Sequence, residues 1–210
     1  MAREGILIVV SGFSGAGKGT IMKELTGRHE QYALSVSATT REARPGEKEG
    51  KDYFFKSRED FERMIEEGAL IEYARYVGNY YGTPKAYVEE MLLSGKDVIL
   101  EIEIQGARKI REQFPNAVLL FVTTKDAQVL RERLKKRGTE SREVIQKRLL
   151  RAVQESEGIE EYDYLVVNDE LNACVAEIHS IIESEHRKIR YNMELVNRVR
   201  EELRSFSKGE

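Results

Sequence analysis

The sequence predicts an α/β fold with a central parallel sheet, and three observations support this prediction. Four short apolar runs, at residues 6–10, 97–102, 117–122 and 164–167, have the length and composition of buried strands. Helical patterns alternate with these runs, which is typical of a parallel sheet. The first run leads through a glycine-rich loop directly into a helix, and such a junction is suited to binding phosphate.

The length and composition favour one soluble domain in a reducing compartment. The chain has 210 residues and a net charge of −3, which gives no reason to expect non-specific binding to nucleic acid or membranes. Its only cysteine, Cys174, excludes an internal disulfide, and its apolar neighbours predict a buried thiol. No apolar run is long enough for a membrane span or a signal peptide, so we expect a cytoplasmic protein. His29, His179 and His186 are scattered without metal-ligand spacing.

The loop after the first strand is a phosphate-binding P-loop. Its glycines let backbone N–H groups converge on a phosphate, and the helix N-terminus adds further donors. The lysine supplies a full charge for the outer phosphates. A ligand-free turn is the alternative, but the glycines, the lysine and the preceding strand are all in register. The loop residues are Gly12, Phe13, Ser14, Gly15, Ala16, Gly17, Lys18, Gly19 and Thr20.

The residues after the loop lysine depart from the usual P-loop pattern, in which serine or threonine follows directly. Here Gly19 intervenes before Thr20, and the resulting Lys-Gly-Thr resembles the form found in nucleoside monophosphate kinases. Thr20 is therefore expected to contact a phosphate or the Mg²⁺ shell. Phe13 stands where that resemblance leads us to expect proline, and it either shields the phosphates or packs on a lid.

The middle of the chain predicts a small antiparallel insert with helices. A strand at 32–37 and a long polar loop at 38–51 precede a short strand at 53–55. Ser57 begins a capping-box signal for a helix that ends at Gly68. Strands at 70–76 and 80–83 form a hairpin, and Thr83 is expected to cap a helix with proline at its first position, stopped by Gly95.

The second half of the chain returns to strand-helix alternation. Helices are predicted at 105–113, from Ala127 to Gly138, and from Val144 to Val153. A single long helical pattern then runs from Leu171 to Val196. Its end is highly charged and is expected to project or fray.

Several stretches in this order resemble the guanylate kinase family. They are Ser-Ala-Thr-Thr-Arg-Glu-Ala-Arg-Pro-Gly-Glu at 37–47, Gly-Lys-Asp-Tyr-Phe-Phe at 50–55, Gly-Asn-Tyr-Tyr-Gly-Thr at 78–83 and Glu-Ile-Glu-Ile-Gln-Gly at 101–106. The resemblance covers nearly the whole chain and implies transfer of the γ-phosphoryl group of ATP to GMP, with Mg²⁺. It also implies a three-layer P-loop NTPase fold in one domain. Its parts would be a core (1–34, 95–125 and 160–190), a mixed α/β GMP-binding insert (35–94), a helical lid (126–159) and a C-terminal helical extension (191–210).

The resemblance places the GMP phosphate and the guanine base in the insert. Fixed donors suit a doubly charged phosphate, and the resemblance assigns them to Arg41, Arg44, Tyr53 and Tyr81. Guanine shows two N–H donors beside one acceptor, so a carboxylate can distinguish it from adenine. The resemblance makes Glu72 that carboxylate, with Ser37 and Thr83 completing the base contacts. Without the resemblance, Arg41 and Arg44 would be interpreted as solvated loop charges and Glu72 as a surface glutamate.

Two glutamates end a core strand, at the edge where open α/β sheets bind ligands. Glu101 and Glu103 share a face because they are two residues apart on a strand. The resemblance places the second near the acceptor base, although many family members carry the shorter aspartate there. No aspartate stands where a direct Mg²⁺ ligand is expected, so phosphates and waters would hold the ion. Thr20 is the residue that could join them.

The basic helices at 126–159 resemble a lid that closes over ATP. Arg137 and Arg148 match lid arginines that neutralise charge on the transferred phosphoryl group. The other basic residues there, Arg133 and Arg151 among them, are expected to be solvated. Asn168 matches a segment near the adenine of ATP, although it or Asp169 could instead cap the last helix.

Two other functions remain open at this point. One is a different small-molecule kinase with the same P-loop, against which Glu72, Ser37 and Thr83 argue. The other is a non-catalytic module that binds partner peptides, against which the complete P-loop argues. The expected partners are ATP and GMP, with dGMP and a homo-oligomer left open, and with neither nucleic acid nor a membrane.

Overall fold

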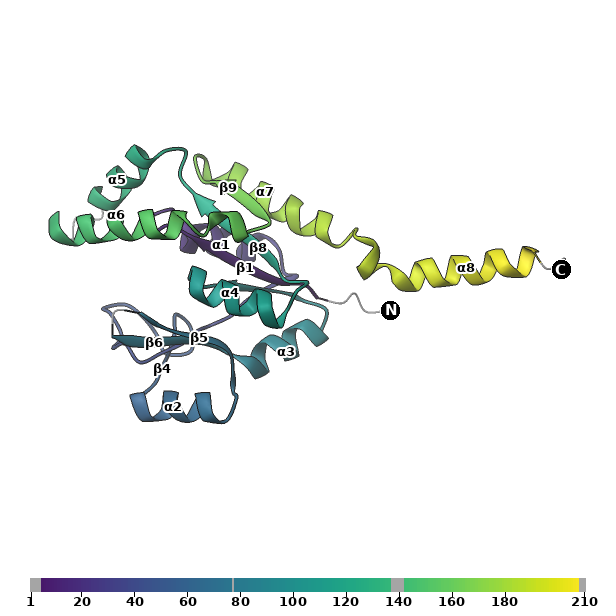
Figure 1. Ribbon diagram of the computed structural model, residues 1–210, viewed down its shortest axis with the longest axis horizontal. Coiled ribbons are helices and arrows are strands. Elements are labelled where there is room, and N and C mark those ends of the chain that lie inside the picture. Colours follow the sequence, from purple (N-terminus) through teal and green to yellow (C-terminus); the bar gives the residue numbers. More distant parts are fainter. Residues whose placement is uncertain (1–4, 77, 137–141, 208–210) are drawn as a thin grey trace.

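The computed structural model describes residues 5–76, 78–136 and 142–207 (Figure 1). Its larger sheet has five parallel strands in the order β2-β7-β1-β8-β9. The predicted central parallel sheet is therefore confirmed. The strands are β1 (Leu7–Gly12), β2 (Tyr32–Leu34), β7 (Asp97–Glu101), β8 (Val118–Thr123) and β9 (Tyr164–Val167).

Helices cover both faces of this sheet and give three layers. Alternate residues of β1 point to opposite faces. Ile8 and Val10 pack in the cluster that α1 and α7 cover, whereas Leu7 and Val9 pack in the cluster that α3 and α4 cover. The covering helices are α1 (Lys18–Arg28), α3 (Lys85–Leu93), α4 (Ile104–Gln113) and α7 (Leu171–Glu185). The predicted buried thiol of Cys174 on α7 is confirmed, since this residue is 1% exposed.

The insert forms a second, smaller sheet in the order β4-β3-β6-β5. The expectation of a wholly antiparallel insert is wrong, because β3 pairs in parallel with β4 and antiparallel with β6. The predicted hairpin between β5 and β6 is present. The elements are β3 (Ala38–Thr39), β4 (Phe54–Phe55), α2 (Arg58–Glu66), β5 (Leu70–Tyr76) and β6 (Asn79–Pro84).

Of the two helix caps predicted in the insert, one is confirmed and one is wrong. The hydroxyl of Ser57 accepts a hydrogen bond from the N–H of Asp60 at 3.0 Å and caps α2. Thr83 does not cap α3, because the cap position is occupied by Pro84. The hydroxyl of Thr83 instead donates to Glu72 Oε1 at 2.8 Å inside the insert.

The second half adds the lid helices α5 (Ala127–Lys136) and α6 (Arg142–Ser156) and the 3₁₀ helix η1 (Ile159–Glu161). In Figure 1 the lid helices and the insert lie on opposite sides of the core sheet. The expected end of a lid helix at Gly138 lies outside the described residues.

The long C-terminal helix is interrupted, so its prediction as one element is wrong. After α7, the chain forms the 3₁₀ helix η2 (Ile189–Tyr191) and then α8 (Met193–Ser207). The carboxylate of Glu185, which is 1% exposed at the end of α7, binds the hydroxyl of Tyr164 and the ammonium of Lys188. Helix α8 projects away from the body of the molecule, as expected for this end of the chain (Figure 1).

Among the helices of the described ranges, none combines the length and apolar character that crossing a membrane requires.

Two of the histidines are less scattered than the sequence suggests. The rings of His29 and His179 stack with their centroids 3.9 Å apart, and Tyr32 hydrogen-bonds His179 Nδ1 at 2.6 Å. Residues 5–76, 78–136 and 142–207 contain no group of three or more His, Cys, Asp or Glu residues arranged to hold a metal ion.

Candidate functional site

The P-loop connects β1 to α1 and places its lysine at the mouth of the helix. Gly15 and Gly17 both have φ of +95°, a conformation that residues with a Cβ rarely adopt, and Gly17 is the cap position of α1. A Cβ on Gly12 would lie 2.1 Å from the carbonyl oxygen of Val122, so the loop also needs this glycine to pass close to β8. Lys18 Nζ donates to the carbonyl of Gly12 at 2.7 Å. The loop thus has the backbone geometry of a phosphate cradle.

Phe13 packs on the core rather than on the lid. Its ring lies edge-to-face on Phe121 of β8, with the centroids 5.0 Å apart and an interplanar angle of 81°. It joins the hydrophobic cluster between the sheet, α1 and α7. The aromatic residue in the P-loop therefore anchors the loop to the sheet.

Asn168 is 7% exposed and supports the back of the P-loop. Its side chain Nδ2 donates to the carbonyl of Ala16 at 2.7 Å. Arg133 of the lid donates to the same carbonyl at 3.3 Å and to the carbonyl of Asn168 at 2.8 Å, so the expectation that Arg133 is solvated is wrong. The alternative, that Asn168 or Asp169 caps the last helix, is wrong for α7, because Glu170 caps it by accepting from two N–H groups.

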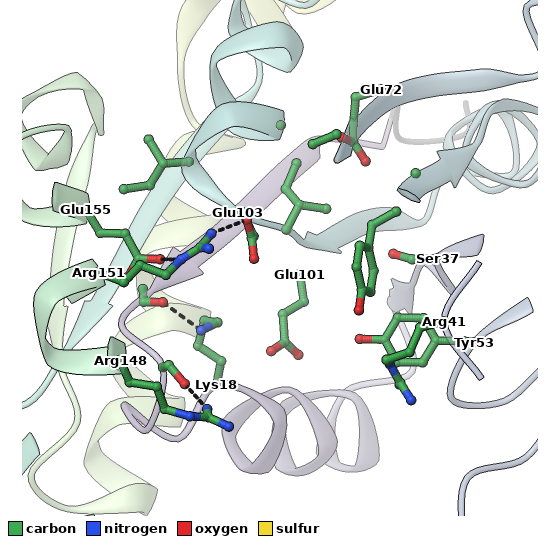
Figure 2. Close-up of a pocket in the computed structure, with 18 of the residues that line it drawn as sticks. Lys18, Ser37, Arg41, Tyr53, Glu72, Glu101, Glu103, Arg148, Arg151 and Glu155 are labelled. Carbon is green, nitrogen blue, oxygen red and sulfur yellow. Dashed lines mark hydrogen bonds and ion pairs between the residues drawn. The ribbon is translucent and has the colours of Figure 1, made fainter. Parts of the chain in front are cut away.

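A pocket of about 280 Å³ lies between the P-loop, the insert and the lid (Figure 2). It brings together eleven of the residues that the sequence assigned to ATP, GMP or catalysis. Further lining comes from Glu101, which the sequence placed at the strand end, from Arg151, which was expected to be solvated, and from Glu155, which had no assigned role. The eleven are Gly12, Ser14, Lys18, Ser37, Arg41, Arg44, Tyr53, Glu72, Tyr81, Glu103 and Arg148.

Glu72 is a buried carboxylate whose one side faces this pocket. It is 5% exposed on β5 and accepts the hydroxyl hydrogen of Thr83. Burial raises the pKa of Glu72 to about 7, against the opposing effect of the Thr83 hydrogen bond. Gly106 of α4 lies so close that a Cβ there would be 2.7 Å from Glu72 Oε2. Gly106 was part of the recognised sequence motif, but nothing local in the sequence indicates this contact.

Arg41 is held ready at the insert side of the pocket by a carboxylate that the sequence did not assign. Its guanidinium donates to both carboxylate oxygens of Glu47, each at 2.9 Å, and lies 5.2 Å from the centre of the Tyr53 ring. Glu47 also accepts the backbone N–H of Arg44 at 2.8 Å. The side chain of Arg44 is exposed, and that of Tyr81 is half-buried beside Tyr53. Two cations and two phenols therefore surround one wall of the pocket.

Glu101, the last residue of β7, and Glu103, just beyond the strand, both line the pocket. Burial raises the pKa of Glu101, and the charge of Lys18 opposes this shift. Burial also raises the pKa of Glu103, while Arg151 opposes the shift through an ion pair at 2.6 Å. The expectation that Arg151 is solvated is therefore wrong. Its signal in the sequence is the spacing of three residues from Arg148, which puts both on one face of α6.

The lid reaches the P-loop through Arg148, whose Nη1 donates to the hydroxyl of Ser14. Figure 2 shows this contact beside Lys18. Arg137, the other predicted lid arginine, lies outside the described residues. Gly15, Gly17, Gly19 and Thr20 line an adjoining hollow together with Lys18 and Glu101. Its hydroxyl and carboxylate oxygens are donors of the kind that Mg²⁺ prefers.

Comparisons with known proteins agree with this geometry. The sequence profile described as guanylate kinase matches residues 4–185. A guanylate kinase of Caldanaerobacter subterraneus subsp. tengcongensis is 49% identical over 200 residues, which are 95% of this chain and 97% of the relative. One of Desulfitobacterium hafniense is 52% identical over 186 residues, covering 89% and 93% of the two chains.

A solved structure adds the fold. The crystal structure of guanylate kinase from Anaplasma phagocytophilum matches with a TM-score of 0.73 and 34% identity, covering 89% of this chain and 88% of that chain. The profile and the relatives each span most of the sequence. Residues of the P-loop, the buried carboxylate of Glu72 and arginines of the insert and the lid line one pocket. This chain therefore belongs to the guanylate kinase family, whose members are P-loop kinases that transfer the γ-phosphoryl group of ATP to GMP.

Proposed function

We propose that Glu72 and Thr83 select guanine in this guanylate kinase, while the P-loop and the lid arginines carry the phosphates of ATP. The observation that carries the proposal is the buried Glu72 carboxylate beside the pocket, with one oxygen bound to Thr83. A buried carboxylate that keeps acceptor capacity can take the two N–H donors of guanine. Adenine would leave it unpaired in a buried site, which costs more than the lost contact alone. Ser37, also in the pocket, completes the contacts to the base.

The acceptor phosphate is assigned to the cationic wall of the insert. Arg41 and Arg44 provide charge, and Tyr53 and Tyr81 provide hydroxyl donors. In the described structure Nη2 of Arg41 donates to both carboxylate oxygens of Glu47. A monophosphate also presents anionic oxygens, so it would replace Glu47 on Arg41 or share the guanidinium with it. Because Glu47 already orders the guanidinium, binding of the phosphate to Arg41 loses less conformational entropy.

ATP is assigned to the P-loop, with its outer phosphates at Lys18 and its adenine toward the Asn168 segment. Arg148 and Arg137 are assigned to stabilising the negative charge on the phosphoryl group in the transition state of its transfer. Glu103 is assigned to the acceptor side near the base. The transfer is direct and in line, because none of these assignments supplies a covalent nucleophile. Positioning and electrostatic stabilisation therefore provide the rate.

Mg²⁺ is the proposed cofactor, and it neutralises the phosphates of ATP. Thr20 and Glu101 face the hollow beside the P-loop, and they would hold the ion through its water shell rather than as a full ligand set. Lys18 and the loop N–H groups bind the same phosphates from the other side. The proposal further assigns residues 35–94 to GMP, 126–159 to lid closure and 191–210 to an extension outside catalysis. Self-association through α8 is left as an outcome to be measured.

The test is ADP release from MgATP with GMP, dGMP, AMP, UMP or no acceptor. We expect fast release with GMP, extending to dGMP if the 2′-hydroxyl is not read. Glu72→Ala should lower kcat/KM for GMP by about 100-fold or more, as expected when a buried hydrogen-bonding partner is lost. Glu66→Ala, which removes an exposed glutamate of α2, is the matched control and should act like wild type.

Either of two results would overturn the assignment. Release that does not depend on an acceptor would make the protein an ATPase. Equal turnover of GMP by Glu72→Ala and wild type would show that another group reads the base.

A further inference from the structure

A salt bridge crosses the pocket from the lid to the end of β7. Arg151 Nη2 donates to Glu103 Oε2 at 2.6 Å, and Arg151 Nε donates to Glu155 Oε1 at 2.8 Å. Figure 2 shows the guanidinium between these two carboxylates. The side chains of Arg151 and Glu103 are 29% and 39% exposed, so water screens the bridge only in part.

One face of α6 touches both halves of the site. Arg148 and Arg151 are three residues apart and lie on the same side of the helix. Arg148 donates to Ser14 in the P-loop, whereas Arg151 donates to Glu103. Because the helix moves as a rigid element, a shift of the lid that changes one contact also changes the other.

Glu103 adjoins the part of the molecule that surrounds Glu72. It occupies the cap position of α4 without making a side-chain capping bond, and its carboxylate lies in the pocket, where it binds Arg151. Gly106, in the first turn of the same helix, lies against the carboxylate of Glu72. The charge of Glu103 also adds to the effect of burial on the pKa of Glu72. A group that fixes Glu103 therefore acts on the guanine side of the pocket.

We propose that Arg151 is a positioning residue that couples ATP binding to GMP binding through Glu103. The inference rests on the proposed function, because it takes the P-loop as the ATP side and Glu72 as the GMP side. ATP at the P-loop would hold the lid in the position seen here, in which Arg151 contacts Glu103 and fixes one wall of the acceptor pocket. Each nucleotide then binds more tightly when the other is present, and the two enhancements are equal by thermodynamic linkage.

The experiment measures GMP affinity by titration calorimetry with and without a saturating non-hydrolysable MgATP analogue. The ratio of the two dissociation constants is the coupling factor. We expect a coupling factor of about fivefold or more for wild type, in the range usual for linked sites. Arg151→Ala should reduce this coupling factor below about twofold. Arg151→Lys should fall between them, because lysine keeps the charge but loses the planar fork.

Three further variants separate this role from a general effect. Lys147→Ala removes an exposed cation from the same helix and should keep the wild-type coupling factor. Glu103→Gln should lose coupling as Arg151→Ala does, and the double variant should lose no more than either single one. Circular dichroism and thermal unfolding check that each variant is folded.

The outcomes for the bridge and for the proposed function can be told apart. If Glu72→Ala binds GMP as tightly as wild type, the proposed function fails. If GMP binding depends on Glu72 but wild type shows no coupling, or Arg151→Ala keeps it, the role of Arg151 is overturned while the proposed function stands.

Discussion

At the scale of single residues, the proposed selection of guanine depends on a carboxylate that is buried yet must be ionised to accept from the base. Glu72 sits 5% exposed, and burial raises its pKa to about 7. Only the ionised form can accept both N–H donors of the base. The fraction that is ionised therefore changes steeply over the pH range in which the protein would be assayed.

The first prediction concerns the pH dependence of GMP use. As pH falls from 8 to 6 through the raised pKa of Glu72, the carboxylate takes up a proton, so kcat/KM for GMP should fall by about tenfold per pH unit below 7. The KM for ATP should change less. Initial rates across pH check this expectation.

Two variants identify the group responsible. Glu72→Gln removes the titrating carboxylate, so the remaining pH dependence should be that of the GMP phosphate, whose second pKa is about 6. The Thr83 hydroxyl holds the pKa of Glu72 down, so Thr83→Val should move the midpoint to higher pH. A midpoint that stays in place in Glu72→Gln would assign the titration elsewhere.

The second prediction concerns Gly106, whose role depends on space. A Cβ at this position would lie 2.7 Å from Glu72 Oε2 and would displace the carboxylate. Alanine is otherwise the better helix former by about 1 kcal/mol. Gly106→Ala should therefore raise the KM for GMP at least about tenfold, equivalent to about 1.4 kcal/mol, without lowering Tm by much. An unchanged KM for GMP would mean that the carboxylate has room to move aside.

Residue roles that depend on distant neighbours could not be predicted from the sequence. The P-loop and the buried Glu72 were predicted because their signals are local or belong to a recognised motif. The contacts Arg151–Glu103 and Asn168–Ala16 join residues 48 and 152 positions apart, and Phe13 packs on Phe121 of another strand. Only folding brings these partners together. The sequence therefore assigned a solvated role to an arginine that lines the pocket.

At the scale of elements, the core strands and most helices were predicted because their periodicity and caps are local. The apolar run of β9 and the cap of α2 are examples. The two-residue strand β3 was placed in a loop, since its pairing with β6 is about 40 residues distant. The break between α7 and α8 carries no glycine or proline. It follows the buried carboxylate of Glu185, which binds Tyr164 on β9.

The third prediction concerns α8, which projects from the body of the molecule (Figure 1). Val199, Leu203 and Phe206 are exposed large apolar residues on this helix. The two pockets at the P-loop are lined by residues outside α8. Ending the chain after residue 192 should therefore leave kcat and both KM values within about twofold of wild type, as expected for changes away from the site.

The same truncation measures what the apolar side of α8 does. An isolated helix of this length is marginal in water, and packing of its apolar side against a second copy would stabilise it. Light scattering of the full and shortened chains will show whether copies associate through α8. A loss of turnover in the shortened chain, with its unfolding transition intact, would contradict the assignment of α8 to an extension outside catalysis.

At the scale of the whole molecule, residues from three parts of the chain meet at one pocket. The core sheet carries the P-loop, the insert carries Glu72 and Arg41, and the lid carries Arg148. The insert leaves the core after β2 and returns through α3, which packs on the core sheet. Two connections between the insert and the core permit a hinge.

The last prediction is that the two nucleotides close the molecule in separable steps. GMP should draw the insert toward the core through Arg41 and Glu72, and an MgATP analogue should draw the lid inward through the P-loop and Arg148. Exclusion of water between these bodies favours transfer to GMP over hydrolysis of ATP. Small-angle scattering at several protein concentrations, extrapolated to infinite dilution, should show a smaller radius of gyration with each ligand and the smallest with both. Scattering curves that superpose with and without both ligands would mean that the site is already closed, and catalysis would then have to exclude water without domain motion.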